Sequence, residues 1–393
     1  MREAKVSHFV KDHVIFKLYS GGVKTNRDAW AYDFNKNVLE GKMLRFIDTY
    51  NGEIDRWRRR SNSSITVDNF VTYDDSKIKW SSSLKAEVLR LQYVDFTKDK
   101  IRKALYRPFC KEWLFLERIF IERVYQFPQI LPIPEAENVV ICVSAIGSNK
   151  LFHCLATDVI PDMHLTGDTQ CFPYYTYAGD GSNRRENITD WALGQFQARY
   201  GAEVTKWDIF QYVYGILHHP QYRERYAENL KRDLPHIPLL NRKEAFQLCV
   251  RVGRELMHLH LNYEQAQEDQ KVELLENRDV PFSWRVEKMR LSTDRRVVVV
   301  NESLRLGPIP PECFAYRLGN RSALEWVLDQ YQVSEDKRSG IVSDPNRIGD
   351  EEDYIVRLLR RVVTVSVETV RLVNELAQGV MMADWMDEGG GEG

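Results

Sequence analysis

The stretch Ala178-Gly179-Asp180-Gly181-Ser182-Asn183 separates two kinds of sequence pattern along this chain. Glycine, aspartate and asparagine are typical of turns because they tolerate backbone geometries that other residues resist. Before this stretch, short β-favouring runs predominate from about residue 101 to 176, and after it apolar residues recur at helical spacing from Thr189 onward. The sequence therefore predicts an α+β protein. It has a mixed, β-rich domain over 1–182, a mostly helical domain with a small β-hairpin over 183–380, and a flexible tail over 381–393.

Runs of β-branched and aromatic residues in the first half predict strands over 113–116, 138–143, 151–155 and 171–177. A further short strand is expected over 14–19, closed by the turn residues Ser20-Gly21-Gly22. Two helices are predicted in this half. The first covers 38–60 and is either continuous or interrupted at Asn51-Gly52, and the second covers 84–92 with Ser83 as its N-cap.

The second half has apolar residues at three- and four-residue steps, which predicts helices over 189–200, 205–218, 220–232, 242–264, 322–331 and 351–378. Within the last of these, Val362-Val363-Thr364-Val365-Ser366-Val367 would also suit a strand, because β-branched residues favour strands. Residues 284–306 predict a β-hairpin that turns at Ser292-Thr293-Asp294.

Composition places the chain among globular proteins, with 393 residues and 43% hydrophobic content. No apolar window approaches the length of a membrane span, and the first residues mix charges with polar groups, so we expect neither membrane insertion nor export. The cysteines lie in apolar surroundings, and no two of them have the spacing of a zinc or redox site. We expect reduced core cysteines in a cytoplasmic protein: Cys110, Cys142, Cys154, Cys171, Cys249 and Cys313.

The net charge of −2 conceals an asymmetry between the two ends of the chain. Residues 1–134 carry 25 lysines and arginines against 17 aspartates and glutamates, a net of +8, whereas 135–393 carry 30 against 40, a net of −10. The basic end is where a polyanion could bind. The alternative is a solvated surface with no partner, because charge runs commonly have that role.

Motifs for catalysis are missing from the sequence. An amino-methyltransferase needs an Asn-Pro-Pro-aromatic or Asp-Pro-Pro-aromatic motif, yet the adjacent prolines Pro310-Pro311 follow Ile309. There is no phosphate-cradling Gly-x-x-x-x-Gly-Lys-Ser/Thr loop. Glu255, His258, His260 and Glu264 form one partial metal set without a second. We therefore predict no catalytic residue and no metal site on this chain.

Basic, amide and hydroxyl side chains gather in the predicted loops and helix ends of the first half. Lysine and arginine neutralise phosphates, while arginine and asparagine can read base edges through paired hydrogen bonds. The candidate DNA-binding residues are Lys24, Thr25, Asn26, Arg27, Arg56, Arg58, Arg59, Arg60, Arg107, Ser144, Ser148, Asn149 and Lys150. Among them we expect phosphate contacts from Lys24, Arg27 and Arg58 to Arg60, and base reading from the loops 144–150 and 163–170.

Several stretches together resemble the C-terminal specificity region of type ISP restriction-modification enzymes. They extend over nearly the whole chain, and jointly they are specific. They are Ser20-Gly-Gly-Val-Lys-Thr-Asn-Arg-Asp-Ala-Trp30, Ala104-Leu-Tyr-Arg-Pro-Phe109, Asp208-Ile-Phe-Gln-Tyr-Val-Tyr-Gly-Ile-Leu-His218, Tyr222-Arg-Glu-Arg-Tyr226, 255–264, 322–333 and 337–346.

The resemblance implies sequence-specific recognition of double-stranded DNA. Members of the family carry a nuclease, a helicase-like motor, a coupling region, an adenine-specific methyltransferase and a target-recognition domain in one polypeptide. This sequence resembles the last part alone, so we expect Met1 to fall close to the end of a methyltransferase domain. S-adenosylmethionine, ATP and Mg are expected on the other regions and no cofactor on this chain. The partners implied are DNA and those methyltransferase and helicase-nuclease regions.

Two matters stay open at this point. The chain could be a separate specificity subunit, a fragment of a split gene or an excised domain. It could also be an interaction or scaffold module whose helical half docks on a methyltransferase-helicase partner without binding DNA specifically.

Overall fold

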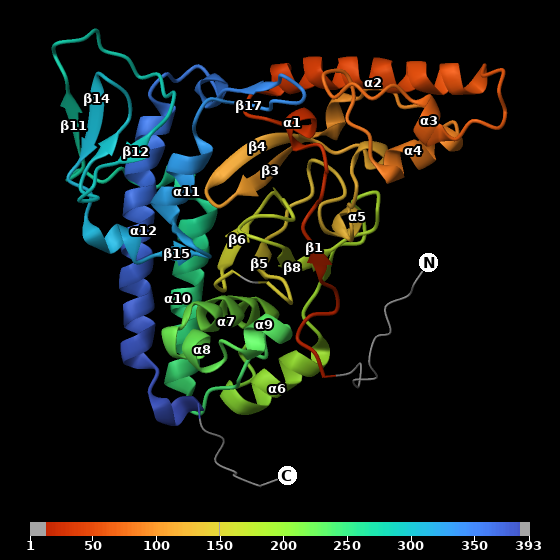
Figure 1. Ribbon diagram of the computed structural model, residues 1–393. Helices are drawn as coiled ribbons and strands as arrows, with labels where there is room; N and C mark the ends of the chain where they lie inside the picture. The colour runs from red at the N-terminus through yellow and green to blue at the C-terminus, as the bar shows by residue number, and fades with distance from the viewer. Residues whose placement is uncertain (1–12, 149, 386–393) are drawn as a thin grey trace.

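Two four-stranded sheets lie at the centre of the first half of the chain in the computed structural model, which describes residues 13–148 and 150–385 (Figure 1). The first sheet has the strand order β1-β8-β5-β6, with every neighbouring pair antiparallel. The second has the order β2-β4-β3-β7, in which β3 and β7 run parallel. Their bounds are β1 Ser20–Gly21, β2 Tyr32–Asp33, β3 Ile101–Arg107, β4 Cys110–Phe115, β5 Val140–Ser144, β6 Cys154–Thr157, β7 Ile160–Pro161 and β8 Thr169–Pro173.

Helices enclose these sheets and make up most of the second half, as the α+β prediction expected. On the N-terminal side they are α1 Asp28–Ala31, α2 Lys36–Arg58, α3 Val67–Phe70, α4 Ser82–Leu89 and α5 Phe127–Ile130. The remaining helices are α6 Asp190–Tyr200, α7 Lys206–His218, α8 Pro220–Arg225, α9 Asn229–Arg232, α10 Lys243–Leu261, α11 Ala323–Gln330 and α12 Tyr354–Gly379. Figure 1 shows α12 running beside α10, and α2 extending away from the sheets.

Strand β5 is buried on both faces, which explains its uninterrupted apolar sequence. Because successive side chains of a strand point to opposite faces, Val140 and Cys142 join one hydrophobic cluster while Ile141 and Val143 join another. The first cluster connects the strands to α11 and α12, and the second connects them to α6, α7 and α10. Both clusters thus contain residues from each side of the predicted boundary at 182, and that boundary itself stays a prediction.

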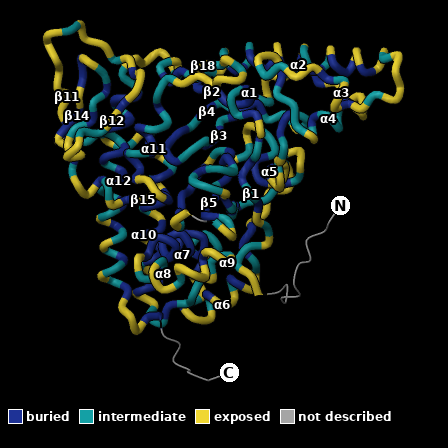
Figure 2. The backbone as a smooth tube through the Cα atoms, in the orientation of Figure 1, coloured by how far each residue is buried: buried dark blue, intermediate teal, exposed yellow. Residues whose placement is uncertain are grey.

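Helices α7 and α10 cross with their backbones in contact. A Cβ atom built on Gly253 would lie 2.0 Å from the carbonyl oxygen of Gln211, so glycine is required at this crossing. Every residue from Ile209 to His218 in α7 is buried, and Figure 2 shows this helix as an almost continuous buried segment. The strand alternative for 362–367 is settled in favour of helix α12. Its Ser366 and Thr369 hydroxyls donate to the carbonyls of Val362 and Val365, each at 2.7 Å.

The predicted strand over 14–19 is wrong. Only a single bridge pairs Phe16 with Ile188, and the strand β1 begins later, at Ser20. The reason is the buried side chain of Asn187, which accepts from Leu18 N at 2.8 Å and donates to Leu18 O at 2.8 Å. These bonds take the backbone groups that a neighbouring strand would otherwise pair.

Several predicted element ends also differ. The N-cap of α4 is Ser81, which accepts from Leu84 N, and Ser83 lies inside the helix. Helix 220–232 is divided into α8 and α9, because Tyr226 leaves helical geometry with φ −104° and ψ 18°. Helix α2 continues through Asn51-Gly52, where the Asn51 side chain bonds both backbone groups of Val94.

The predicted hairpin over 284–306 belongs to a larger sheet of order β11-β14-β13-β12. Its strands are β11 Glu273–Glu276, β12 Arg290–Leu291, β13 Val298–Val299 and β14 Leu304–Gly307. Three two-stranded hairpins complete the strands that the structure describes: β9 Tyr175–Thr176 with β10 Arg185–Glu186, β15 Arg317–Leu318 with β16 Arg321–Ser322, and β17 Ser334–Glu335 with β18 Val342–Ser343.

The start of the predicted flexible tail packs against the protein. Residues Met382–Trp385 form a short 3-10 helix, and the buried Asp384 pairs with Arg242 at 2.7 Å. The rest of that predicted tail, 386–393, lies outside the described residues.

Glu112 on β4 provides a test of this packing through its titration. Burial raises the pKa of Glu112 to about 8, although the nearby Lys42 acts in the opposite direction. At pH values between 4.5 and about 8, Glu112 therefore keeps its proton in the folded chain. In the unfolded chain, where its pKa is 4.5, it releases that proton. The stability that this group contributes is full below the unfolded pKa and is lost as the pH rises toward the folded one.

We expect Glu112→Gln to remove this loss while keeping the shape of the side chain. The free energy of unfolding of the variant, relative to the unmodified chain, should rise as the pH increases from about 5 to about 8. Urea unfolding at several pH values measures it. Parallel stability profiles for the two proteins would show that Glu112 is ionised in the folded state.

Candidate nucleic-acid interface

The loop 22–26 is fixed to the chain around Asp162 by a close backbone approach. A Cβ atom built on Gly22 would lie 2.5 Å from the carbonyl oxygen of Asp162. Beside it, Val23 N donates to Pro161 O at 2.9 Å and Met163 N donates to Val23 O at 2.8 Å. Gly22 N also donates to Thr169 O at 3.2 Å, so the loop bonds both ends of the segment 163–170.

Asp162 joins three segments through its carboxylate, which is only 1% exposed. Its Oδ1 accepts from Arg107 Nη1 at 2.9 Å and from His164 N at 2.8 Å, and its Oδ2 accepts from the Tyr32 hydroxyl at 3.0 Å. Burial raises the pKa of Asp162 to about 6, while the Arg107 charge acts to lower it. The carboxylate therefore ties the end of β3, the residues after α1 and the loop 163–170 together.

Arg27 was predicted to contact phosphate, and its position contradicts this. The side chain is 1% exposed, and its guanidinium donates to the carbonyls of Phe120 and Lys79 and to the Ser81 hydroxyl. Burial lowers the pKa of Arg27 to about 10. Thr25 is likewise buried and donates to Asp28. Thr25 and Arg27 therefore support the loop 22–26 from its buried side.

Lys24 and Asn26 are the candidate residues of this loop whose side chains reach the surface. Lys24 is half-buried, and its backbone pairs with that of Arg123. Lys24 N donates to Arg123 O at 2.9 Å, and Arg123 N donates to Lys24 O at 3.0 Å. Asn26 is exposed and has a φ of 58°, a conformation that asparagine tolerates better than most residues. Both side chains are placed where a ligand can reach them.

Arg107 also has a structural position, contrary to its predicted role as a DNA contact. Its side chain is 17% exposed, bonds Asp162 and lies over the ring of Tyr106 at 3.8 Å. Because its charge is already paired with a buried carboxylate, Arg107 fixes the loops and is not available as a free phosphate contact.

The two loops predicted to read bases lie side by side. Ala145 N donates to Asp168 O at 2.8 Å, and a Cβ atom on Gly167 would lie 3.3 Å from Cγ of Lys150. Ser144 is buried and bonds the His153 Nδ1 at 2.9 Å, so it supports the loop and does not reach its surface. Ser148 is half-buried and Lys150 is exposed, whereas Asn149 lies outside the described residues.

Arg56 to Arg60 lie at the end of α2, which Figure 1 shows extending away from the sheets that carry the other loops. Arg56 pairs with Glu53, and Arg60 lies over the ring of Trp57 at 3.8 Å. Arg58 and Arg59 are exposed. The structure therefore does not bring this basic cluster together with the loop 22–26.

Two residues beside these loops were missed by the sequence analysis, and a third, His164, lies in the loop 163–170 that was predicted to read bases. Arg123 is 58% exposed, and Tyr125 is 43% exposed with its ring over Gly21. His164 pairs with Asp168 at 2.9 Å and is 42% exposed. An arginine and a tyrosine two residues apart could have drawn attention, but nothing in the sequence places 122–125 next to Lys24.

We use the name loop surface for residues 22–26, 122–125, 144–148, 150 and 163–170. Its segments contact one another through the backbone bonds given above. The exposed or half-exposed groups include lysine, arginine, asparagine, tyrosine and histidine side chains. Such a set can neutralise phosphates, stack and form hydrogen bonds to base edges.

The histidines weighed for a metal site have structural roles. His260 is buried between the Tyr214 hydroxyl at 2.6 Å and the Thr369 hydroxyl at 2.9 Å, and burial lowers its pKa to about 3. His258 bonds Asn262 on the exposed side of α10. Across 13–148 and 150–385, no three histidine, cysteine, aspartate or glutamate residues gather as a metal would need.

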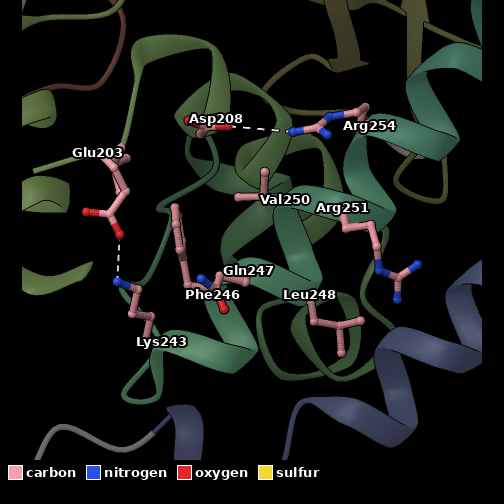
Figure 3. Close-up of a pocket in the computed structure, with 10 residues that line it drawn as sticks. Glu203, Asp208, Lys243, Phe246, Gln247, Leu248, Val250, Arg251 and Arg254 are labelled. Atoms are coloured by element: carbon pink, nitrogen blue, oxygen red, sulfur yellow. Dashed lines mark hydrogen bonds and ion pairs between the residues drawn. The ribbon is translucent and has the colours of Figure 1, made fainter. Parts of the chain in front are cut away.

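A separate groove of about 620 Å³ runs along α10 and the start of α7 (Figure 3). Each of its three cations pairs with a carboxylate, since Lys243 bonds Glu203 at 2.6 Å and Arg254 lies 3.7 Å from Asp208. The third, Arg251, bonds Glu255 just outside the groove at 2.9 Å. Because opposite charges are balanced here, this groove lacks the excess positive charge that attracts a polyanion.

Comparison with known proteins decides the family. A family model described as the type ISP C-terminal specificity domain matches residues 14–358. The chain belongs to this family. The resemblance expected from the sequence is confirmed, and the chain is a type ISP specificity module. No curated protein matched. No helix within 13–148 and 150–385 combines the length and apolar character needed to cross a membrane.

Solved structures agree with this assignment. A nuclease-deletion mutant of the type ISP enzyme LlaGI, in complex with a DNA substrate mimic, is 36% identical with a TM-score of 0.83 over 93% of this chain. The ATP-dependent type ISP enzyme LlaBIII bound to DNA is 31% identical with a TM-score of 0.81 over 92%. The DrdV–DNA complex is 35% identical with a TM-score of 0.79 over 95%. The specificity module covers 33%, 23% and 36% of those chains respectively.

Gly22→Ala should destabilise the specificity module, because the new Cβ has no space against the Asp162 backbone. We expect a loss of about 1–3 kcal/mol in the free energy of unfolding, as for other overpacked sites. Gly41→Ala is the control, since nothing lies within 4 Å of a Cβ there and alanine favours the helix. Urea unfolding of both variants measures the difference, and equal stabilities would mean that the approach at Gly22 is not tight.

Proposed function

We propose that the loop surface recognises a specific sequence of double-stranded DNA, as the target-recognition part of a type ISP restriction-modification system. The observation that carries this is the convergence of four segments distant in sequence, held by backbone bonds and by Asp162. Recognition needs a rigid frame for exposed side chains, because a misplaced donor cannot pair with a base edge.

The similar structures support DNA as the ligand. The three solved relatives are described as bound to DNA or to a DNA substrate mimic. The sequence asymmetry adds to this, because the loop surface draws two of its four segments from the basic residues 1–134.

The side chains divide into two proposed roles. Lys24 and Arg123, together with Arg58, Arg59 and Arg60 on α2, contact phosphates and position the duplex. Asn26 and the polar groups of 163–170 read bases, since an asparagine amide can pair with adenine through two hydrogen bonds. Arg27, Arg107 and Ser144 are assigned no DNA contact because the fold uses their polar groups.

Adenine-specific methylation and DNA cleavage are assigned to other regions of the type ISP enzyme. Those methyltransferase and helicase-nuclease regions would bind S-adenosylmethionine, ATP and Mg. The helical half, with α10 and α12, braces the sheets that carry the loops. A scaffold module would instead show no sequence preference for duplex, which separates the two functions experimentally.

Affinity for duplex should fall steeply with salt, with a log–log slope of about −0.9 per phosphate contact. Reversing Arg58, Arg59 and Arg60 to glutamate should weaken binding to all sequences similarly and make this slope shallower. The matched control reverses Arg278, Lys288 and Arg290, which are exposed and form no ion pair among the described residues. Fluorescence anisotropy over a salt series measures the duplex affinity and the salt slope of each variant. If the two triple variants behave alike, the end of α2 is not a phosphate contact.

Asn26→Asp should reduce the preference for the target in addition to the uniform loss of duplex affinity that its added negative charge causes. Aspartate keeps the size and tolerates the positive φ but cannot donate to a base. We expect a loss of about 1–3 kcal/mol of discrimination if a bidentate contact is removed. Asn183→Asp is the control, because Asn183 is also exposed with a φ of 61° but lies outside the loop surface.

The target is first obtained by selecting bound duplexes from a random pool, and the two variants are then compared on it. Loss of preference in Asn26→Asp alone supports base reading by this loop. The scaffold module would replace the proposed function if the unmodified chain enriched no sequence.

A further inference from the structure

Arg223 on α8 is a half-buried cation that has no carboxylate partner within residues 13–148 and 150–385. Its Nε donates to the Leu217 carbonyl at 2.6 Å, near the end of α7. Neither of its terminal nitrogens has an acceptor among the residues that the structure describes, and no ion pair forms there. The guanidinium carbon lies 5.5 Å from the ring centroid of Phe152, and this cation–π contact offsets only part of the cost of removing the charge from water.

The surroundings of Arg223 do not supply the missing negative charge. Its ionisable neighbours are three histidines, the thiol of Cys154 and the hydroxyls of Tyr214 and Tyr316. The histidines are His153 just before β6, His218 at the end of α7 and His260 on α10. Burial, and after it the Arg223 charge, lowers the pKa of His153 to about 3, so that ring is neutral. Burial also raises the pKa of the Cys154 thiol and keeps it protonated.

A cavity of about 280 Å³ opens beside Arg223, and its polar lining is mostly basic. Lys150, Lys231 and Ser148 line it with Arg223, while Leu151 and Phe152 are among its apolar residues. Lys150 forms no ion pair in the described part of the chain. Lys231 pairs with Glu228, but both side chains are more than half exposed, at 54% and 70%, so this pair is weak.

The cavity is built into the loop surface. Gly147 N donates to Lys231 O at 2.8 Å, which joins the loop after β5 to α9. On the opposite side, Gly167 lies against Lys150 and Ser148. Arg223 itself is oriented by its bond to Leu217, which leaves the two terminal nitrogens of the guanidinium for a ligand.

We propose that this cavity binds a phosphate group of the DNA backbone, with Arg223 donating to its oxygens and with Lys150 and Ser148 at its rim. A guanidinium matches two phosphate oxygens in geometry, and partial burial strengthens the attraction. The inference rests on the proposed function and adds a phosphate contact from the helical half. It also assigns Ser148 and Lys150 to phosphate contact instead of the base reading expected from the sequence.

Arg223→Gln in the full chain tests the proposal. We expect duplex affinity to fall on the order of tenfold at about 0.1 M salt, with a slope shallower by about 0.9. The loss should be equal for target and non-target duplexes, because phosphates carry no sequence information. Arg225→Gln is the matched control, since Arg225 is exposed on the same helix and does not line the cavity. Arg223→Lys should recover part of the affinity, because it keeps the charge.

A second variant covers the case in which Arg223→Gln fails to fold. Ser148→Ala combined with Lys150→Gln changes only the rim, and it should also flatten the salt slope. If both variants bind duplex like the unmodified chain while that chain does bind, the phosphate site is overturned and the proposed function stands. If the unmodified chain binds no duplex, both are overturned.

Inorganic phosphate distinguishes the duplex from a free anion as the ligand. At constant ionic strength, phosphate should raise the unfolding temperature of the unmodified chain more than that of Arg223→Gln, and it should compete with duplex. Stabilisation by phosphate with unchanged duplex binding in Arg223→Gln would show that the cavity takes a free anion, which contradicts the backbone contact proposed here.

Discussion

The hydrogen bonds of the Asp162 carboxylate determine where the loops of this module lie. Arg107, Tyr32 and the backbone of His164 all donate to it, and each belongs to a different segment. A buried carboxylate is expensive unless its oxygens are satisfied, so these partners cannot be separated without exposing an unpaired charge. Gly22 adds the close backbone approach that brings the loop 22–26 to the same place. The loop surface depends on this arrangement, although few of the residues that create it are accessible.

This arrangement divides the basic residues into two groups that the sequence could not distinguish. Arg27 and Arg107 hold the loops from within, while Lys24, Arg123 and Lys150 remain at or near the surface. From composition and spacing, both Arg27 and Arg107 were predicted to contact DNA, because a charged side chain in a predicted loop usually faces water. Only the tertiary structure brings the carbonyl of Phe120 to the guanidinium of Arg27. That Arg223 has no carboxylate partner in the described part of the chain was invisible for the same reason, since no sequence pattern reports a missing partner.

The predictions that succeeded rest on local periodicity. Helices α10 and α12 follow from apolar residues at three- and four-residue steps, and β5 follows from a short apolar run. The predictions that failed involve side chains acting on distant backbone. Asn187 interrupts the expected strand over 14–19. The predicted hairpin over 284–306 left out β11, which is a strand because its backbone pairs with the distant β14. The family could be recognised from the sequence because its motifs include residues such as Gly22 and Arg27, whose roles are structural.

Hydrogen exchange of the backbone amides, with and without duplex DNA, tests the central claim most directly. If the loop surface is the DNA interface, duplex should slow exchange within 22–26, 122–125, 144–148 and 163–170 and around Arg223. The groove between Glu203 and Arg254 should exchange at the same rate in both conditions. Protection confined to that groove, or absent from all four segments while duplex is bound, would contradict the account.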